Sequence, residues 1–296
     1  PVRCSRRVHD VGIYENLILG IHFLLLKKCK IFDEKTIVTC YTDRSMRINV
    51  RKHERRGYQS IKMSNILEKQ FLKQRNDFEK SCVERDKKYH FPQGVIFETD
   101  IAYAKDKNKA HRLDRYRPKG KETQILPVII NVHGGGLLLG NKEFNKYFCA
   151  LLSKKGFLVY SMEYRLIPDC TFFDQLRDIF LAMDFVKEHA AADGGDLSHV
   201  YLVGDSGGAC LATYANAIQN SKKIAKAAGV KPSELKVHAL GLISGMFYTT
   251  KFDKIGLFLS KYLYGKQYKK APFAAYVNPE NPELLYALAP AWLVTS

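Results

Sequence analysis

The sequence predicts an α/β fold, with a mostly parallel sheet flanked by helices, and three observations lead to this prediction. The chain has 296 residues, of which 46% are hydrophobic and 26% charged, so it can bury one large core or two small ones. From residue 127 onward, short β-branched runs alternate with segments of helical length. Strands separated by helices in this way form βαβ units, whose parallel sheet is covered on both faces. The composition excludes collagen, coiled coils and a wholly disordered chain.

The first domain, residues 1–92, is predicted to be a mostly helical N-terminal cap. Its apolar residues alternate with basic clusters and recur at spacings that suit one face of a long helix. The residues of this face are Ile61, Met63, Ile66, Leu67, Phe71, Leu72 and Phe78.

The second domain, residues 93–296, is predicted to hold the sheet. The pattern changes at Gly94, where two strands joined by a polar turn begin, and Pro118 ends the second of them. In chain order we expect strands at 95–104, 112–117, 127–132, 157–161, 200–203, 237–243 and 292–295, and helices at 143–154, 172–189 and 209–228.

An aromatic-rich stretch at 246–290 interrupts this alternation before the last run. We interpret it as a cap insertion, a lid over a cleft at the carboxyl edge of the sheet. The alternative is a helical excursion whose aromatic side chains pack on the core.

The basic charge of the chain is concentrated in its N-terminal part. Residues 1–120 hold 28 Lys and Arg against 15 Asp and Glu, a net charge of +13, whereas residues 121–296 hold 19 against 15, a net of +4. No zinc finger or aromatic-and-basic RNA-binding pattern accompanies the excess. We therefore expect a solvated basic helical face and no nucleic-acid partner.

The cysteines and the apolar segment near the start bear on location. Seven cysteines are scattered without CxxC pairs, which indicates reduced thiols and a cytoplasmic protein. The apolar stretch 17–26 is ten residues long, contains His22 and is followed by lysines. We expect an amphipathic surface or lid helix there rather than a membrane anchor.

The first motif with chemical meaning is the run Gly204-Asp205-Ser206-Gly207-Gly208. It follows an expected strand and precedes an expected helix, which is the setting of a nucleophile elbow. The sharp turn exposes the hydroxyl of Ser206 at a helix N-terminus, whose partial positive charge stabilises a developing oxyanion.

The second motif is the run His133-Gly134-Gly135-Gly136, directly after the strand at 127–132. Consecutive glycines present backbone N–H groups without side chains in the way, as a preformed oxyanion hole requires. The alternative, a merely flexible loop, does not explain the strand before it. The two motifs together, in this order, point to acyl transfer.

With these motifs the chain resembles the α/β-hydrolases of the hormone-sensitive lipase family of esterases. The run from Tyr164 to Asp169, Tyr-Arg-Leu-Ile-Pro-Asp, is similar to the family's Tyr-Arg-Leu-Ala-Pro-Glu, and the run from Leu113 to Pro118 is similar to its second-strand signature. The resemblance covers about residues 94–296, whereas residues 1–92 match only the position of the usual cap. It implies the α/β-hydrolase fold with a helical cap, an eight-stranded sheet and hydrolysis of carboxylic esters.

The resemblance also implies roles for single residues. Ser206 matches the catalytic nucleophile, and Gly135, Gly136 and Gly207 match the three backbone donors of the oxyanion hole. The motif and structural positions are His133 and Gly134 of the glycine loop, Asp205 before the serine, and Arg165 and Asp169, which look like structural residues beneath the site. His133 matches a residue that orders the loop and is not the base. Many relatives carry Ala where this chain has Gly207, so we expect a more flexible elbow.

A catalytic acid and base are expected beyond the last residue. In the family the acid follows the next-to-last strand and the base histidine follows the last one, and residues 290–296 look like that next-to-last strand. The last strand and helix are therefore expected to be absent from the 296 residues. No histidine of the chain stands where the base should be; His199 and His238 are at strand entrances. We expect this chain, made alone, to hydrolyse esters little faster than background.

Two functions follow from these observations. The first is a serine carboxylesterase that hydrolyses short- to medium-chain carboxylic esters through an acyl-enzyme on Ser206. The alternative is a catalytically dead binding protein on the hydrolase fold, as in the gibberellin receptors. An intact nucleophile and glycine loop favour the enzyme. Because metal-binding clusters and Rossmann or Walker patterns are missing from the sequence, we expect a small-molecule ester partner, no cofactor and no metal.

Overall fold

The computed structural model of the protein describes residues 60–245, 276 and 292–295. Most of the expected lid at 246–290, and residues 1–59 of the expected cap, therefore lie outside the described residues. The apolar stretch at 17–26 lies there too. Tyr276, the described residue of the lid segment, is half-buried and packs against the core.

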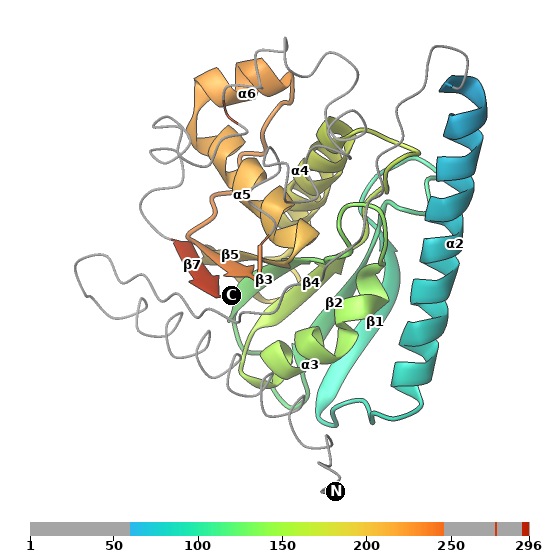
Figure 1. The fold of residues 1–296 in the computed structure, drawn as a ribbon. Helices are drawn as coiled ribbons and strands as arrows, with labels where there is room; N and C mark the ends of the chain where they lie inside the picture. Colours follow the sequence, from blue (N-terminus) through green and yellow to red (C-terminus); the bar gives the residue numbers. More distant parts are fainter. Residues whose placement is uncertain (1–59, 246–275, 277–291, 296) are drawn as a thin grey trace, which may run out of the picture.

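The described residues form one seven-stranded sheet in the order β1-β2-β4-β3-β5-β6-β7 (Figure 1). Strand β2 pairs antiparallel with both β1 and β4, and the pairs among β4, β3, β5, β6 and β7 are all parallel. The strands are β1 Val95–Ala102, β2 Arg112–Pro118, β3 Leu126–Val132, β4 Leu158–Met162, β5 Gly195–Asp205, β6 Ala239–Ile243 and β7 Trp292–Thr295. The predicted α/β class with a mostly parallel sheet is confirmed.

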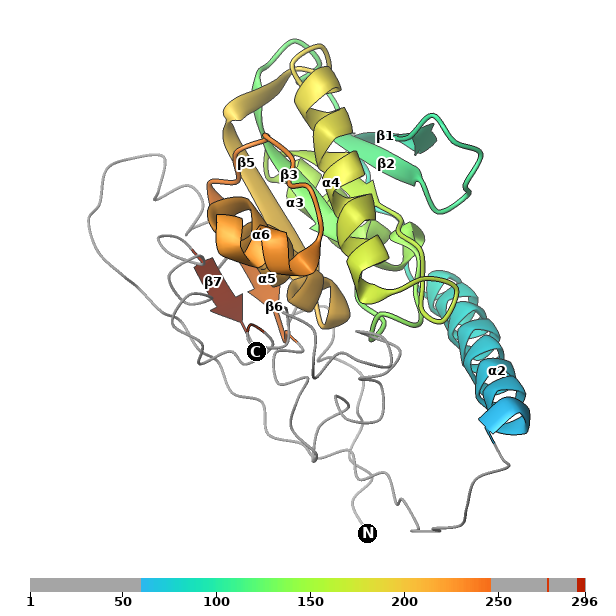
Figure 2. The same cartoon turned by 90° about the horizontal axis from the view of Figure 1, so that it is seen from above.

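Helices cover both faces of this sheet, as Figure 2 shows. The helices are α2 Ser60–Asp86, the 3-10 turn η1 Lys142–Asn145, α3 Lys146–Lys154, α4 Phe172–His189, α5 Gly207–Asn220 and α6 Lys222–Ala228. Helices α4, α5 and α6 lie together over one face, and α3 covers the other.

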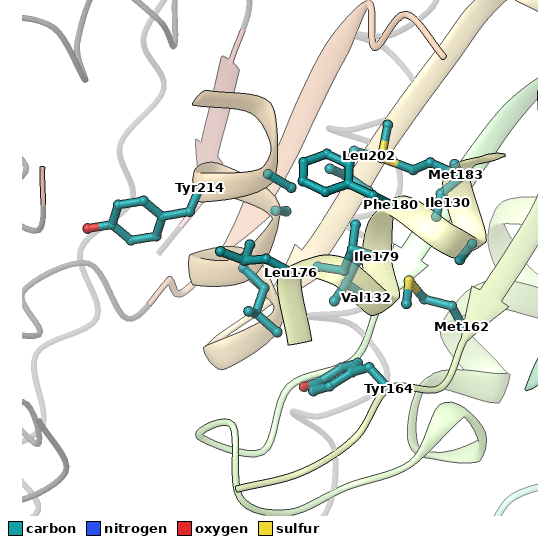
Figure 3. Packing of buried hydrophobic residues seen from close by; sticks show 14 of the residues in the cluster. Ile130, Val132, Met162, Tyr164, Leu176, Ile179, Phe180, Met183, Leu202 and Tyr214 are labelled. Atoms are coloured by element: carbon teal, nitrogen blue, oxygen red, sulfur yellow. The ribbon is translucent and has the colours of Figure 1, made fainter. Parts of the chain in front are cut away.

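The central strands are apolar on both sides because each face carries its own core. In β3, Ile130 and Val132 point into the cluster with α4 and α5, whereas Ile129 points to the cluster with α3. Alternation of side chains along a strand produces this division. Figure 3 shows the larger cluster, in which Ile130 and Leu202 of the sheet meet Ile179 and Met183 of α4. Burial on both faces explains why these strands are continuous apolar runs.

Helix α2 confirms the helical prediction for residues 61–78 and packs along one stripe. Phe71 is buried, and Arg75, Phe78 and Cys82 are half-buried, at successive spacings of four, three and four. The ring of Phe78 lies 5.0 Å from that of Phe144 in η1. The prediction that Leu72 lies on the same face is wrong. Leu72 is 53% exposed, because it lies one position away from the buried stripe.

Two of the boundaries that differ from the sequence prediction have a clear physical reason. The helix expected at 209–228 is two helices, because Ser221 is extended (φ −135°, ψ 114°) and its hydroxyl accepts a hydrogen bond from Ile224 N. Strand β5 begins at Gly195 rather than at Val200, because Gly195 pairs with Leu126 of β3.

In the part of the chain that the structure describes, no helix combines the length and the apolar character needed to span a membrane.

Candidate active site

The two glycine-containing motifs meet because β3 and β5 are parallel neighbours. Val132, the last residue of β3, pairs with Gly204 near the end of β5. The loop after β3, residues 133–140 (hereafter the glycine loop), therefore emerges beside the turn that follows β5. Carboxyl ends of adjacent parallel strands are the usual place for a binding site in an open α/β sheet.

Ser206 occupies a strained turn between β5 and α5. Its backbone angles are φ 48° and ψ −113°, a region that costs a residue with a side chain about 1–3 kcal/mol. Its amide donates to Ile243 O at 2.8 Å, which anchors the turn to β6. A Cβ on Gly204 would lie 2.6 Å from the carbonyl of Gly208, and one on Gly208 would lie 2.1 Å from Val132 O. Only glycine fits at both positions.

The glycine loop lies directly against the start of α5. A Cβ built on Gly207 would lie 2.9 Å from Leu137 N and 3.1 Å from Gly136 N. Gly135 and Gly136 both have positive φ, 117° and 62°. The structure therefore brings Gly136 and Gly207, two of the three expected oxyanion donors, into contact beside Ser206. Gly135 is the neighbour of Gly136 in the same loop.

Asp205 fixes the beginning of the glycine loop. Its Oδ1 accepts hydrogen bonds from Gly134 N at 2.9 Å and from Asn145 Nδ2 at 2.8 Å. A Cβ on Gly134 would lie 2.2 Å from Asp205 Oδ2, so the loop can approach this carboxylate only through a glycine. Burial raises the pKa of Asp205. Asn145, in η1, was not predicted, because no sequence pattern indicates that it reaches the elbow.

His133 is a fully buried residue whose two ring nitrogens are both engaged. Nδ1 lies 2.8 Å from Gly134 O and Nε2 lies 3.0 Å from Glu163 Oε1. Its ring stacks on Tyr164, whose hydroxyl donates to His133 O at 2.7 Å. Burial disfavours the charged imidazole, but the neighbouring Glu163 carboxylate prevails, and the pKa of His133 is raised. This geometry supports a role in ordering the loop. Glu163 was not predicted.

Arg165 is held by a carboxylate in the interior. Its Nε and Nη2 donate to Asp178, at 2.9 Å and 2.6 Å, and Arg165 N donates to Asp178 Oδ2 at 3.0 Å. The Asp178 side chain is fully buried and also lies 3.1 Å from His111 Nε2. Arg165 therefore joins the segment after β4 to α4. Asp178 was missed, since one aspartate in an amphipathic helix carries no signal of its partner.

Asp169 does not lie beneath the site as expected. Its side chain is 67% exposed and pairs with Arg75 of α2 at 2.8 Å. Ile167 is the last buried residue of the motif, and the chain has returned to the surface two residues later, at Asp169.

Gln175 of α4 holds the glycine loop from the interior. It is fully buried, and its Nε2 donates to Leu137 O and to Arg165 O, both at 2.9 Å. Leu137 O also accepts from Ile167 N at 3.1 Å. These contacts stabilise Leu137, which has a positive φ of 70°. Gln175 was not predicted, because its partners are backbone atoms distant in sequence.

Three of the described histidines, His111, His199 and His238, lie away from the elbow or have their ring nitrogens engaged. His199 is in β5 and its ring lies 6.4 Å from that of His238, just before β6. His199 lies in the amino-terminal half of β5 and His238 directly before β6, whereas Ser206 follows the carboxyl end of β5. His111 has both ring nitrogens bound by carboxylates, of Asp106 and Asp178.

Comparisons with known proteins point to one family. The family model BD-FAE matches residues 113–285, more than half of the chain. A probable isoprenylcysteine alpha-carbonyl methylesterase, ICMEL1 of Arabidopsis thaliana, is 29% identical over 185 residues, covering 60% of this chain and 39% of the relative. The versiconal hemiacetal acetate esterase of Dothistroma septosporum is 31% identical over 141 residues, covering 47% and 40%. The chain thus spans about four-tenths of the length of these curated relatives.

Solved structures agree on the architecture. Esterase B from Lactobacillus rhamnosis matches with a TM-score of 0.67 and 25% identity, covering 77% of this chain and 74% of that one. A bacterial heroin esterase shares the fold, with a TM-score of 0.54 at 20% identity. With the strand order and the two glycine motifs described above, these matches make the chain a member of the BD-FAE family, an α/β-hydrolase of the hormone-sensitive lipase type.

Proposed function

We propose that the protein is a serine carboxylesterase that forms an acyl-enzyme on Ser206. The observation that carries the proposal is the contact between the glycine loop and the elbow, where Gly136 N lies 3.1 Å from the position of a Cβ on Gly207. A nucleophile on a strained turn, with backbone donors packed beside it, is the arrangement that acyl transfer needs. A binding protein without turnover has no need of either feature.

The reaction proceeds in two steps on this geometry. Ser206 Oγ attacks the ester carbonyl carbon while a base takes its proton, and the carbonyl oxygen becomes an oxyanion. The amides of Gly135, Gly136 and Gly207 donate hydrogen bonds to that oxyanion, and the N-terminus of α5 adds its positive field. The C–O bond then breaks and the alcohol leaves with the proton. Water hydrolyses the acyl-serine to release the acid and restore Ser206.

The general base must lie within about 3.2 Å of Ser206 Oγ. His133 does not serve, because Gly134 O and Glu163 occupy its two nitrogens. Its role here is to hold the peptide of Gly134, at the start of the loop.

The substrate class we propose is small carboxylic esters with short to medium acyl chains. The names of the relatives specify a methylesterase and an acetate esterase. Esterase B was solved with a C4-C4 tributyrin phosphonate.

We also propose that residues 1–92 and 246–290 form the cap above the site, and that the protein works in the cytoplasm. Four described cysteines are free thiols, and burial raises the pKa of Cys149 and Cys210 to about 12, so these two are unreactive.

The test is hydrolysis of p-nitrophenyl esters from acetate to dodecanoate by the full-length protein. We expect turnover to be highest on the shorter chains. Ser206→Ala should lower kcat by about three or more orders of magnitude with the fold unchanged. Equal activity in Ser206→Ala would refute the assignment of the nucleophile. Tight binding of esters without turnover by the unaltered protein would instead support the binding-protein alternative.

A further inference from the structure

We propose that Arg75 of α2 is a positioning residue for the oxyanion hole, and that α2 thereby holds the glycine loop in its working shape. The inference deepens the proposed function and rests on it, since it assigns the donors of that loop to the same reaction. It concerns a residue outside all the motifs.

The guanidinium of Arg75 bridges three acceptors on two segments near the site. Its Nε donates to Leu138 O at 2.8 Å, its Nη2 to Ile167 O at 2.6 Å, and its Nη1 to Asp169 Oδ2 at 2.8 Å. The side chain is only 14% exposed. Arg75 lies on the buried stripe of α2, one turn after Phe71, which enters the core.

Leu138 belongs to a tight turn that folds back on Gly135. The amides of Leu138 and Leu139 both donate to Gly135 O, at 3.1 Å and 2.9 Å. Leu138 O, which accepts the hydrogen bond from Arg75, therefore lies in the turn that fixes the peptides of Gly135 and Gly136. Gln175 holds the preceding carbonyl, of Leu137, from the core side. Arg75 supplies the matching contact from α2.

The two carbonyl contacts should matter more than the ion pair. Asp169 is 67% exposed, and an exposed ion pair contributes little. Hydrogen bonds from a charged donor to carbonyls are about twice as strong as neutral ones, and here the donor is largely shielded from water. Lysine cannot replace arginine, because one ammonium does not reproduce a planar fork directed at separate acceptors. The oxyanion donors act only when well placed, and a displacement of about 1 Å can cost about 100-fold in rate.

The first measurement follows the loop itself, independently of activity. Amide hydrogen exchange in a peptide spanning residues 134–140 should be faster in Arg75→Met than in the unaltered full-length protein. The matched control is Arg85→Met on the same helix: Arg85 donates to Phe144 O at 2.9 Å and pairs with Asp86, but it does not contact the loop. Arg85→Met should leave exchange in 134–140 unchanged.

The second measurement is ester hydrolysis by the same variants. We expect Arg75→Met to lower kcat by about 10–100-fold with KM within about threefold, because the lost interaction acts on the transition state. Arg75→Lys should be similarly impaired, whereas Asp169→Asn and Arg85→Met should stay within about twofold of the unaltered protein. Methylguanidinium added to Arg75→Ala should restore part of kcat, and it should do nothing for Arg85→Ala.

The outcomes separate the two proposals. If the unaltered protein hydrolyses no ester, the proposed function fails, and the exchange data alone decide whether Arg75 holds the loop. Unchanged exchange in Arg75→Met overturns the inference whatever the activity. Faster exchange with unchanged kcat also overturns it, because the loop would then not need Arg75 for catalysis.

Discussion

At Gly207 a missing methyl group sets the distance between the glycine loop and the elbow. A Cβ there would lie 2.9 Å from Leu137 N, closer than real contacts allow, and its neighbours are backbone atoms that cannot rotate away. Sequence reasoning expected the glycine to make the elbow more flexible; the structure adds a packing reason for it. We predict that Gly207→Ala displaces the loop and lowers kcat about 10–100-fold, measured on a short-chain p-nitrophenyl ester.

The matched control for this prediction is Gly229→Ala. Gly229 ends α6 with a positive φ of 61°, and a Cβ there would meet nothing within 4 Å. Alanine should cost about 1 kcal/mol of unfolding free energy through backbone strain alone, with kcat unchanged. Full activity in Gly207→Ala would show that the loop tolerates the methyl group and would contradict the prediction.

His133 and Glu163 should make the stability of the protein depend on pH. The pKa of His133 is raised above its ordinary 6.5 in the folded state, against burial, by the Glu163 carboxylate. The resulting stabilisation is fully present below about pH 6.5 and is lost as the pH rises through the folded pKa. In Glu163→Gln the largest contribution opposing burial is lost and only those of Gly134 O and Asp205 remain, so the pKa of His133 should be lower than in the unaltered protein.

We therefore predict that Glu163→Gln destabilises the protein most at acidic pH, and that the difference in unfolding free energy shrinks as the pH rises. Urea denaturation at a series of pH values from about 5.5 to 9 measures it. Glu234→Gln, which removes an exposed partner of Lys187, is the control and should show no such trend. A difference that is constant with pH would contradict the prediction, because it would mean that Glu163 does not change the pKa of His133.

Among the elements, those set by local signals were predicted best. The prediction of α4 at 172–189 is confirmed to the residue, because Thr171 and Asp174 form a capping box at its start. The break between α5 and α6 was missed, since Ser221 lies inside a run that continues the helical period. The start of β5 was missed because Gly195 is a strand residue only through its pairing with β3. The start of a helix can be predicted from capping residues close by in the sequence, whereas the end of a strand depends on its pairing with a strand elsewhere in the chain.

Helix α4 is tied to the segment after β4 by the ion pair between the buried Asp178 carboxylate and the half-buried Arg165 guanidinium. Asp178 is fully buried and accepts hydrogen bonds from Arg165 N, Nε and Nη2. The amide of asparagine at this position would leave the Arg165 guanidinium without its counter-charge. We predict that Asp178→Asn lowers the unfolding free energy by about 3 kcal/mol, measured by urea denaturation. Lys187→Met, which breaks the exposed pair with Glu234, should leave stability unchanged. A loss in Asp178→Asn no larger than in Lys187→Met would show that the pair is dispensable.

For the molecule as a whole, the architecture and the meeting of the two motifs could be predicted from the sequence. The residues outside the motifs that hold them in place could not. The glycine loop and the elbow are each one continuous run of residues directly after a strand. Because the two strands are neighbours in the sheet, the topology alone brings the two motifs together. The supporting residues come from segments distant in sequence. Gln175 and Arg75 donate to backbone carbonyls of the glycine loop. The side chains of Asn145 and Glu163 contact those of Asp205 and His133. Such contacts leave no periodicity or spacing to detect.

The net charge of +17 should not make the protein a nucleic-acid binder. Lys69, Lys73 and Lys80 lie along one exposed face of α2, at spacings of four and seven, but Asp77 and Glu84 lie beside them, so the face carries both signs of charge. We predict that the full-length protein passes through an immobilised single-stranded nucleic acid column at about 0.15 M salt. Retention at that salt would contradict the prediction and would indicate a basic surface elsewhere in the chain.

The glycines around Ser206 differ in what holds them, and this determines which of them laboratory evolution can change. Gly134, Gly204 and Gly208 are each blocked by a different neighbour, so no single compensating substitution frees them together. Gly136 is the exception: a Cβ there meets nothing within 4 Å, and its φ of 62° is one that asparagine adopts more readily than other residues. A library selected for new ester preferences should therefore be enriched in Asn at position 136 while the other three stay glycine. The motif thus contains one position at which selectivity can be redesigned.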